Sequence, residues 1–187
     1  MKLENRKVAI LATNGFEKSE LFEPLKALRN EGATVHIISK DTGSIKSWDK
    51  DNWGESIEVD KKVSEVKAAD YNSLVLPGGV ANPDSLRTNE DALLFIRDFF
   101  AQSKPVSAIC HAPWLLISAG VVENRKLTSY ISIKDDLINA GANWADEEVV
   151  VDEGLTTSRN PDDLPAFISK MIEEIKEGKH EDQVVNA

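Results

Sequence analysis

The sequence predicts a single α/β domain with a mostly parallel central sheet and helices on both of its faces. Short apolar runs alternate along the chain with segments of helical periodicity, and glycine, proline or polar turns separate them. The 187 residues are 41% hydrophobic and 29% charged, which suits one globular domain. No repeat or Gly/Pro-rich linker divides them. Alternation of strand and helix is typical of parallel sheets covered on both sides.

Four apolar or β-branched runs predict the buried parallel strands. They are residues 8–12, 34–39, 73–76 and 106–109. The polar and aromatic segment 43–59, with its two tryptophans, predicts a short hairpin that leaves the sheet. Residues 148–151 and 155–157 predict a late strand pair around Glu153 and Gly154.

Helical spacing and end signals predict five helices. Leu21, Leu25 and Leu28 share one face, Thr88 or Asn89 caps the next helix, and Pro113 lies in the first turn of a third. The last two have apolar faces formed by Ile133, Leu137 and Ala140, and by Leu164, Phe167, Ile168, Met171, Ile172 and Ile175. The domain is expected to span residues 1–177, followed by a charged, flexible tail over 178–187.

The charge and cysteine content exclude several classes of partner. The net charge of -10 is offset by no Lys/Arg cluster, so neither nucleic acid nor a membrane is expected as a partner. A single cysteine allows no intrachain disulfide, and no apolar stretch nears membrane-span length, so a cytoplasmic protein is expected. Its three histidines and one cysteine are scattered, so no metal site is expected. No dinucleotide- or phosphate-binding glycine motif occurs, and no cofactor is expected. The acidic runs 146–148 and 173–174 are expected to be solvated.

Sites in open parallel sheets gather beyond the carboxyl ends of the strands. Here that rule selects residues 14–20, 77–84, 110–113 and the turn after 158–159. Cys110 lies between an apolar strand and a helix start, with Ala108 and Ala112 two positions to either side. A nucleophile elbow needs small residues there, and helix amides at such a bend lower the pKa of a thiol. The alternative is a buried, inert cysteine.

Other residues near these strand ends each have two interpretations. His111 is a candidate general base only if the turn is distorted, because neighbours on a regular strand point apart; otherwise it is a packing residue. Gly78 and Gly79 predict a loop whose amides approach a ligand, or an ordinary turn. Glu17 and Glu20 either complement the dipole of the first helix or supply a carboxylic acid to the sulfur.

These motifs together resemble those of PfpI-type intracellular peptidases. The matching segments are residues 16–21 (FEKSEL), 74–79 (LVLPGG), 108–113 (AICHAP), 133–141 (IKDDLINAG), 149–152 (VVVD) and 157–164 (TSRNPDDL). The match covers residues 7–176 in order. The wider superfamily includes the Parkinsonism-associated deglycase, glyoxalase III enzymes and stress chaperones. The resemblance implies a flavodoxin-like three-layer sandwich of the class I glutamine amidotransferase type.

The resemblance also implies roles for particular residues. Cys110 is the nucleophile, His111 its partner, and Glu20 the acid that hydrogen-bonds the sulfur. The oxyanion and substrate are held by Gly78, Gly79 and Ala112. Asp84 of a neighbouring subunit is expected to orient the histidine, although glutamate is more common there.

Ala112 and Trp114 depart from the usual glycine and glutamine of this signature. They predict a narrower, more apolar site mouth, with Trp114 and Glu17 at its rim.

The function expected from these residues is a cysteine-dependent hydrolase that acts on a carbonyl substrate, in stress protection. The substrate is a peptide bond, a glyoxal-type dicarbonyl or a glycation adduct. The alternative is a redox-sensing stress protein or chaperone in which Cys110 is oxidised to a sulfinic acid held by Glu20. A homodimer or larger homo-oligomer is expected, with no cofactor.

Overall fold

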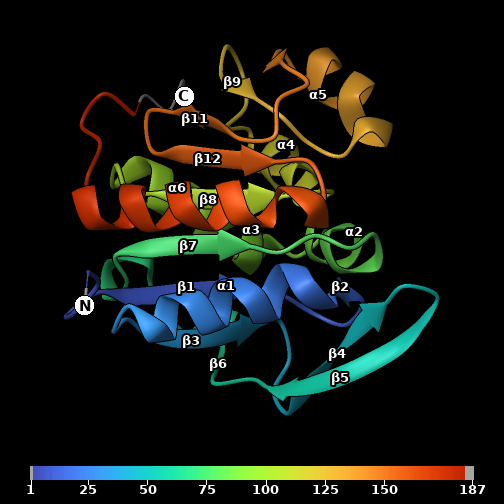
Figure 1. The fold of residues 1–187 in the computed structure, drawn as a ribbon, viewed down its shortest axis with the longest axis vertical. Helices are drawn as coiled ribbons and strands as arrows, with labels where there is room; N and C mark the ends of the chain where they lie inside the picture. The colour runs from blue at the N-terminus through green and yellow to red at the C-terminus, as the bar shows by residue number, and fades with distance from the viewer. Residues whose placement is uncertain (1, 184–187) are drawn as a thin grey trace.

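A seven-stranded sheet forms the centre of the computed structural model, which describes residues 2–183 (Figure 1). In spatial order, its strands are β11 (Val150–Asp152), β12 (Leu155–Ser158), β8 (Val106–Ile109), β7 (Ser73–Leu76), β1 (Lys7–Leu11), β3 (Thr34–Ser39) and β6 (Lys61–Lys62). Every neighbouring pair is parallel except β11 and β12. The predicted α/β fold with a mostly parallel sheet is confirmed.

Helices cover both faces of this sheet. They are α1 (Lys18–Asn30), α2 (Ala81–Leu86), α3 (Glu90–Ala101), α4 (Pro113–Ala119), α5 (Lys134–Asn139) and α6 (Leu164–Glu177). Helices α1 and α6 lie on the near face in Figure 1, with α3 and α4 behind the sheet. Each layer has its own apolar core, one packed by α1 and α6 and the other by α3, α4 and α5. This arrangement is the predicted three-layer sandwich.

The end signals read from the sequence operate as expected. The Asn89 side chain accepts a hydrogen bond from the Ala92 N–H and caps α3. Pro113 is the first residue of α4, where its missing N–H costs nothing. Helix α2 was not predicted, because its six residues include Asn82, Pro83 and Asp84 and lack an apolar stripe.

The segment 43–59 forms the predicted hairpin. Strands β4 (Ser44–Asp49) and β5 (Asn52–Glu58) join β2 (Phe16–Glu17) in a small sheet that extends away from the main one (Figure 1). The rings of Trp48 and Trp53 pack edge to face on this hairpin, 5.5 Å apart.

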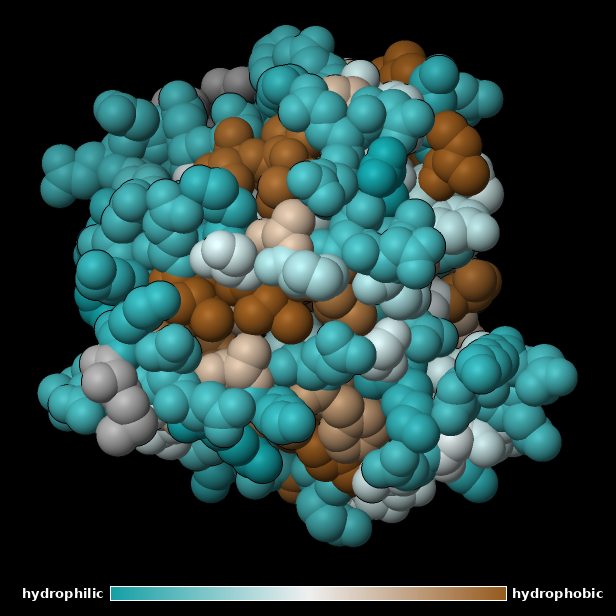
Figure 2. Space-filling model, in the orientation of Figure 1, coloured by the Kyte–Doolittle hydropathy of each residue, from teal (hydrophilic) through white to brown (hydrophobic). Residues whose placement is uncertain are grey.

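Several short elements carry no readable periodicity in the sequence. They are the paired strands β9 (Lys126–Leu127) and β10 (Asn143–Trp144), and the 3₁₀ turns η1 (Val63–Glu65), η2 (Ala68–Asp70), η3 (Ile131–Ile133) and η4 (Pro161–Asp163). Hydrophilic atoms cover most of the face formed by α1 and α6, with apolar atoms visible in bands between elements (Figure 2). Within residues 2–183, no helix has the length and apolar character needed to cross a membrane.

The first residues of the expected tail lie against the domain. The His180 N–H donates to the carbonyl of Ser103 at 2.8 Å, and Gln183 is 4% exposed. His180 and Gln183 therefore pack on the domain, whereas residues 184–187 lie outside the described part of the chain. A flexible end over those last residues stays a prediction.

Candidate active site

The carboxyl ends of three neighbouring strands bring the predicted residues together. Strands β8, β7 and β1 are adjacent, and they lead into Cys110, the glycine loop and the segment before α1. A Cβ atom added to Gly78 would lie 2.5 Å from Glu20 Oε2 and 2.7 Å from Cys110 Cβ. Only glycine therefore fits between the carboxyl group and the cysteine.

Cys110 occupies the distorted bend that the sequence predicts. Its φ of +65° is in the left-handed region, which is uncommon for residues other than glycine. The bend is held from both sides, because the Cys110 N–H donates to Ser158 O at 3.0 Å and its carbonyl accepts from the Tyr130 N–H at 2.9 Å. The side chain is only 6% exposed, so the bend holds the sulfur beneath the surface.

This distortion turns His111 back towards the sulfur. Cys110 Sγ and His111 Nδ1 lie 3.1 Å apart, although the two residues are adjacent in the chain. His111 Nε2 lies 3.0 Å from the hydroxyl of Ser132, and the ring stacks on Tyr130 at 4.7 Å. Burial lowers the pKa of His111, which favours the neutral imidazole that a base requires.

Ser132 and Tyr130 are residues that reasoning from the sequence missed. They lie at the start of η3, which in the chain follows β9 and not a strand of the main sheet where sites were expected. No local pattern marks Ser132 as a partner of the histidine, because their contact depends on how this loop folds back over α4.

The Glu20 carboxyl group is fully buried beside the sulfur. Its Oε2 accepts a hydrogen bond from the Gly78 N–H at 2.9 Å, and it also interacts with Cys110. Burial, aided by the charge of Glu17, raises the pKa of Glu20 to about 8. Most Glu20 side chains therefore hold a proton at neutral pH and can donate it to the sulfur.

The Cys110 thiol and the Glu20 carboxyl group control each other's ionisation. Burial and the negative charge of an ionised Glu20 raise the pKa of the thiol, opposite to the lowering expected at such a bend. The backbone N–H groups of Gly79 and His111 act in the other direction. A protonated Glu20 removes the repulsion and supplies a hydrogen bond, so the thiolate is best supported when the carboxyl group is neutral.

Hydrogen bonding divides the predicted oxyanion amides into occupied and available ones. The Gly78 N–H is bonded to Glu20, and the Ala112 N–H donates to Ile109 O at 3.0 Å, which closes the turn before α4. The amide of Ala112 is therefore unavailable to a substrate, contrary to expectation. The amides of Gly79 and His111 are the ones that stabilise charge on the sulfur.

Asn82 fixes the glycine loop and was also missed. Its Nδ2 donates to the carbonyls of Pro77 and Gly78, at 2.9 and 3.0 Å, and its Oδ1 accepts from the Thr13 N–H at 2.7 Å. The side chain is fully buried. An Asn-Pro pair in a loop reads as a turn, so the sequence carries no sign of this role.

The two expected rim residues have other partners as well. Glu17 caps α1 and accepts from the hydroxyl of Ser19 at 3.1 Å. Trp114 packs its ring edge-on to His111 at 5.3 Å and donates from Nε1 to Asp136 at 2.8 Å. Trp114 therefore adjoins the histidine, whereas Glu17 acts on the site through its charge, which helps to raise the pKa of Glu20.

Asp84 lines a cavity whose other lining residues do not include the histidine. The cavity has a volume of about 470 Å³, and its other lining residues are Gly15, Trp48, Trp53, Val80 and Ala81. Among residues 2–183, the hydrogen bonds of the His111 ring go to Cys110 and Ser132. A role for Asp84 from a second subunit stays a prediction.

Residues 6–174 match the DJ-1/PfpI family. The chain belongs to this family. It is 45% identical over 170 residues to deglycase PfpI of Pyrococcus furiosus, which covers 91% of this chain and 99% of that relative. It is 47% identical over 165 residues to protein/nucleic acid deglycase 2 of Escherichia coli, over 87% of this chain and 94% of the relative.

A solved structure has a similar fold over most of the length of both chains. The fold superposes on DJ-1beta of Drosophila melanogaster with a TM-score of 0.81 at 27% identity, over 92% of this chain and 94% of that one. Membership confirms the resemblance drawn from the motifs, and with it the prediction of a PfpI-type cysteine-dependent enzyme.

Proposed function

We propose that this chain hydrolyses small carbonyl compounds of the glyoxal type and their early adducts on amines and thiols, as a deglycase or glyoxalase III. One observation carries the proposal. The Cys110 sulfur lies between a neutral imidazole at 3.1 Å and a buried carboxyl group whose pKa is about 8. A base and an acid therefore flank one nucleophile, which is the arrangement that covalent catalysis at a carbonyl needs.

The reaction follows from these groups. The thiolate of Cys110 adds to the aldehyde carbon of a 2-oxoaldehyde, and the Gly79 and His111 amides stabilise the resulting oxyanion. A base, His111, moves the hydrogen on that carbon, as a proton, to the neighbouring carbonyl carbon. This shift turns the hemithioacetal into a thioester of a 2-hydroxy acid without any external oxidant. Water then cleaves the thioester, releases the acid and restores the sulfur.

Ser132 is proposed to position the base. Its hydroxyl lies 3.0 Å from His111 Nε2, and Tyr130 holds the ring by stacking. With Nε2 engaged, Nδ1 stays directed at the sulfur 3.1 Å away. The imidazole is therefore fixed by groups of its own chain.

The burial of the site supports a small substrate over a peptide. Cys110 and His111 are 6% and 7% exposed, so an extended polypeptide would need the site mouth to open widely. A three-carbon dicarbonyl, or its adduct at the tip of a side chain, needs much less room. The name of the Pyrococcus relative, a deglycase, agrees with this choice.

The assembly and location of the protein complete the proposal. We expect a cytoplasmic homo-oligomer in which Asp84 of a neighbouring copy approaches His111. Gel filtration and turnover of Asp84→Ala test this part. A monomer that retains full activity would rule out a shared site.

Turnover assays test the central claim. Purified wild type and Cys110→Ala are incubated with methylglyoxal, with its adduct on N-acetylarginine, and with a fluorogenic peptide. We expect loss of the dicarbonyl and formation of lactate by the wild type only. Cys110→Ser serves as the matched control for packing.

The same proteins separate catalysis from redox sensing. Intact mass is measured after mild peroxide. Absence of turnover on every substrate, with a clean gain of two oxygen atoms on the wild type, would overturn the proposed hydrolase and favour a sensor whose sulfinic acid Glu20 holds.

A further inference from the structure

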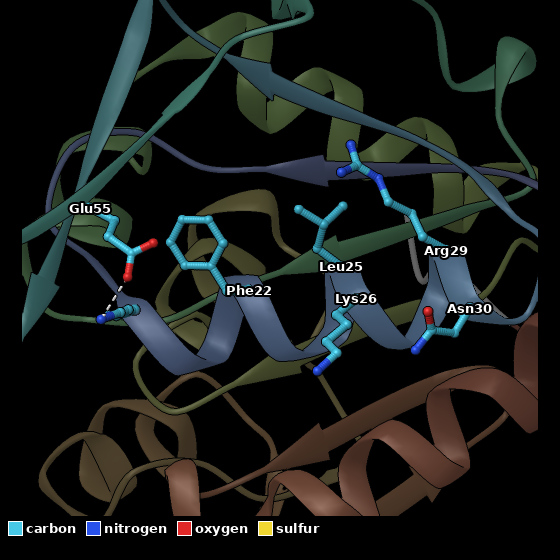
Figure 3. A pocket seen from close by; sticks show the side chains of 7 residues that line it. Phe22, Leu25, Lys26, Arg29, Asn30 and Glu55 are labelled. Atoms are coloured by element: carbon cyan, nitrogen blue, oxygen red, sulfur yellow. Dashed lines mark ion pairs between the residues drawn. The ribbon is translucent and has the colours of Figure 1, made fainter.

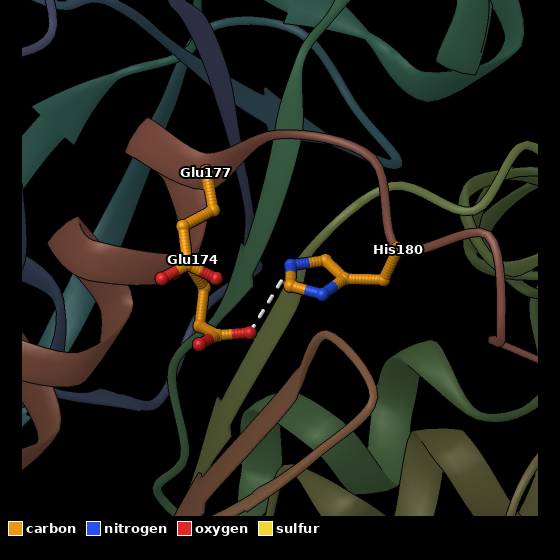
Figure 4. A group of neighbouring side chains, drawn as sticks. All are labelled: Glu174, Glu177 and His180. Carbon is orange, nitrogen blue, oxygen red and sulfur yellow. Dashed lines mark ion pairs between the residues drawn. The ribbon is translucent and has the colours of Figure 1, made fainter.

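A second cluster of polar side chains lies at the carboxyl end of α6, as Figure 4 shows. Glu174 and Glu177 are one turn apart on the helix, and His180 follows in the segment that leaves it. Their nearest ligand atoms all lie within 4.8 Å of one another. Glu174 is only 6% exposed, although the acidic run 173–174 was expected to be solvated. The expectation is wrong there because the helix turns this residue towards the sheet.

Two atoms of the cluster are buried without a hydrogen-bond partner. Glu174 Oε2 and His180 Nε2 face each other at 3.1 Å, and neither forms a hydrogen bond of acceptable geometry with any described residue. An unsatisfied buried carboxylate oxygen is costly, because it has lost its hydration without gaining a hydrogen bond. A metal ion between the two atoms would bind both of them, in place of the direct ion pair that they form at 3.1 Å.

The donor set suits a transition metal ion more closely than calcium or magnesium. One imidazole nitrogen and two carboxylates are ligands that Zn²⁺ accepts, whereas Ca²⁺ and Mg²⁺ prefer oxygen alone. Ligands about 2.0–2.2 Å from a tetrahedral ion lie roughly 3.3 Å from each other. The observed 3.1 Å between Glu174 and His180 is close to this, and the exposed Glu177 is free to rotate towards the same point.

The surroundings hold the imidazole in place. The backbone N–H of His180 donates to the carbonyl of Ser103, and a Cβ atom added to Gly154 would lie 2.8 Å from Cδ2 of the His180 ring. The ring therefore packs directly on the turn between β11 and β12. The carboxyl end of a helix also carries partial negative charge, which favours a cation.

From these contacts we propose that Glu174, Glu177 and His180 bind a divalent transition metal ion such as Zn²⁺, with water completing its coordination. The ion joins α6 to the segment 178–183 and so holds this segment against the domain. Helix α6 begins beyond the carboxyl end of β12 and runs back along the sheet. Its own carboxyl end therefore lies near the amino ends of the strands, whereas Cys110 follows the carboxyl end of β8. The ion is structural and takes no part in the chemistry at the sulfur.

Titration with ZnCl₂ tests the site. The full chain is used as Cys110→Ala, since a thiol beside His111 is itself a competing zinc ligand. Isothermal titration calorimetry and thermal unfolding are measured after treatment with EDTA, and Co²⁺ provides a visible absorption band. We expect one ion per chain, a raised Tm and a Co²⁺ spectrum with a nitrogen ligand.

Variants on the same segment decide the outcome. Glu177→Gln, whose side chain is exposed and whose loss cannot disturb the core, should weaken zinc binding at least about tenfold, and His180→Asn should weaken it further. Glu181→Gln, which is outside the cluster, should bind as the parent does. Two results would overturn the proposal: absence of binding at 100 micromolar zinc, or equal binding by all variants. This concentration is on the order of ten times the Kd expected for a site with three protein ligands.

Discussion

Replacing Glu20 with glutamine removes a buried ionisable group while keeping its shape. In the folded protein the pKa of Glu20 is raised to about 8, mainly by burial, from the ordinary value of 4.5. A carboxyl group with a raised pKa resists ionisation in the native state. The contribution of Glu20 to the free energy of unfolding is therefore fully present below the pKa of the unfolded state, and it is lost as the pH rises towards 8.

The size of this loss follows from the two pKa values. At ~1.4 kcal/mol for each pH unit, the full difference between them is worth roughly 5 kcal/mol, and roughly 3 kcal/mol of it is lost between pH 5 and pH 8. Solvent screening reduces this free-energy difference only slightly, because the Glu20 side chain is 0% exposed. Glutamine has no proton to lose, so Glu20→Gln should lack this part of the pH dependence.

Urea unfolding at pH 5 and pH 8 measures the effect. The wild type should lose about 3 kcal/mol more of its free energy of unfolding between these values than Glu20→Gln does. The variant should also lose catalysis by about 100-fold or more, since an acid is removed. Glu23→Gln, an exposed change on the same helix, is the control. Parallel pH dependence of wild type and Glu20→Gln would refute the assignment of a neutral, buried acid.

Three further substitutions test the site. Ser132→Ala should lower kcat by about 2- to 12-fold, which corresponds to the free energy of one hydrogen bond to His111, while Ser132→Thr should retain activity. An unchanged kcat in the alanine variant would contradict the positioning role. Gly78→Ala should abolish most methylglyoxal turnover, because its Cβ would lie 2.5 Å from Glu20 Oε2, and normal turnover would exclude that geometry. Asn82→Ala should cost about 1–3 kcal/mol in urea unfolding for each buried backbone group left unpaired, and an unchanged midpoint would show that the loop holds itself.

The sequence alone determined the order of the longer strands and helices and the position of the reactive bend. Buried parallel strands appear as continuous apolar runs, and caps and glycines mark helix ends, so these features are local and readable. The small residues around Cys110 similarly predict the elbow. Its φ of +65° then turns His111 towards the sulfur, as the chemistry requires.

The tertiary structure alone decided which polar groups meet, and in what state of ionisation. Glu20 and Glu174 are both acidic residues on helices, and both are buried because the fold turns them towards the sheet. Their raised pKa values come from lost hydration, which depends on packing between elements distant in the chain. The contact of Ser132 with His111 likewise depends on a loop folding over α4, and short-range sequence patterns do not encode that geometry.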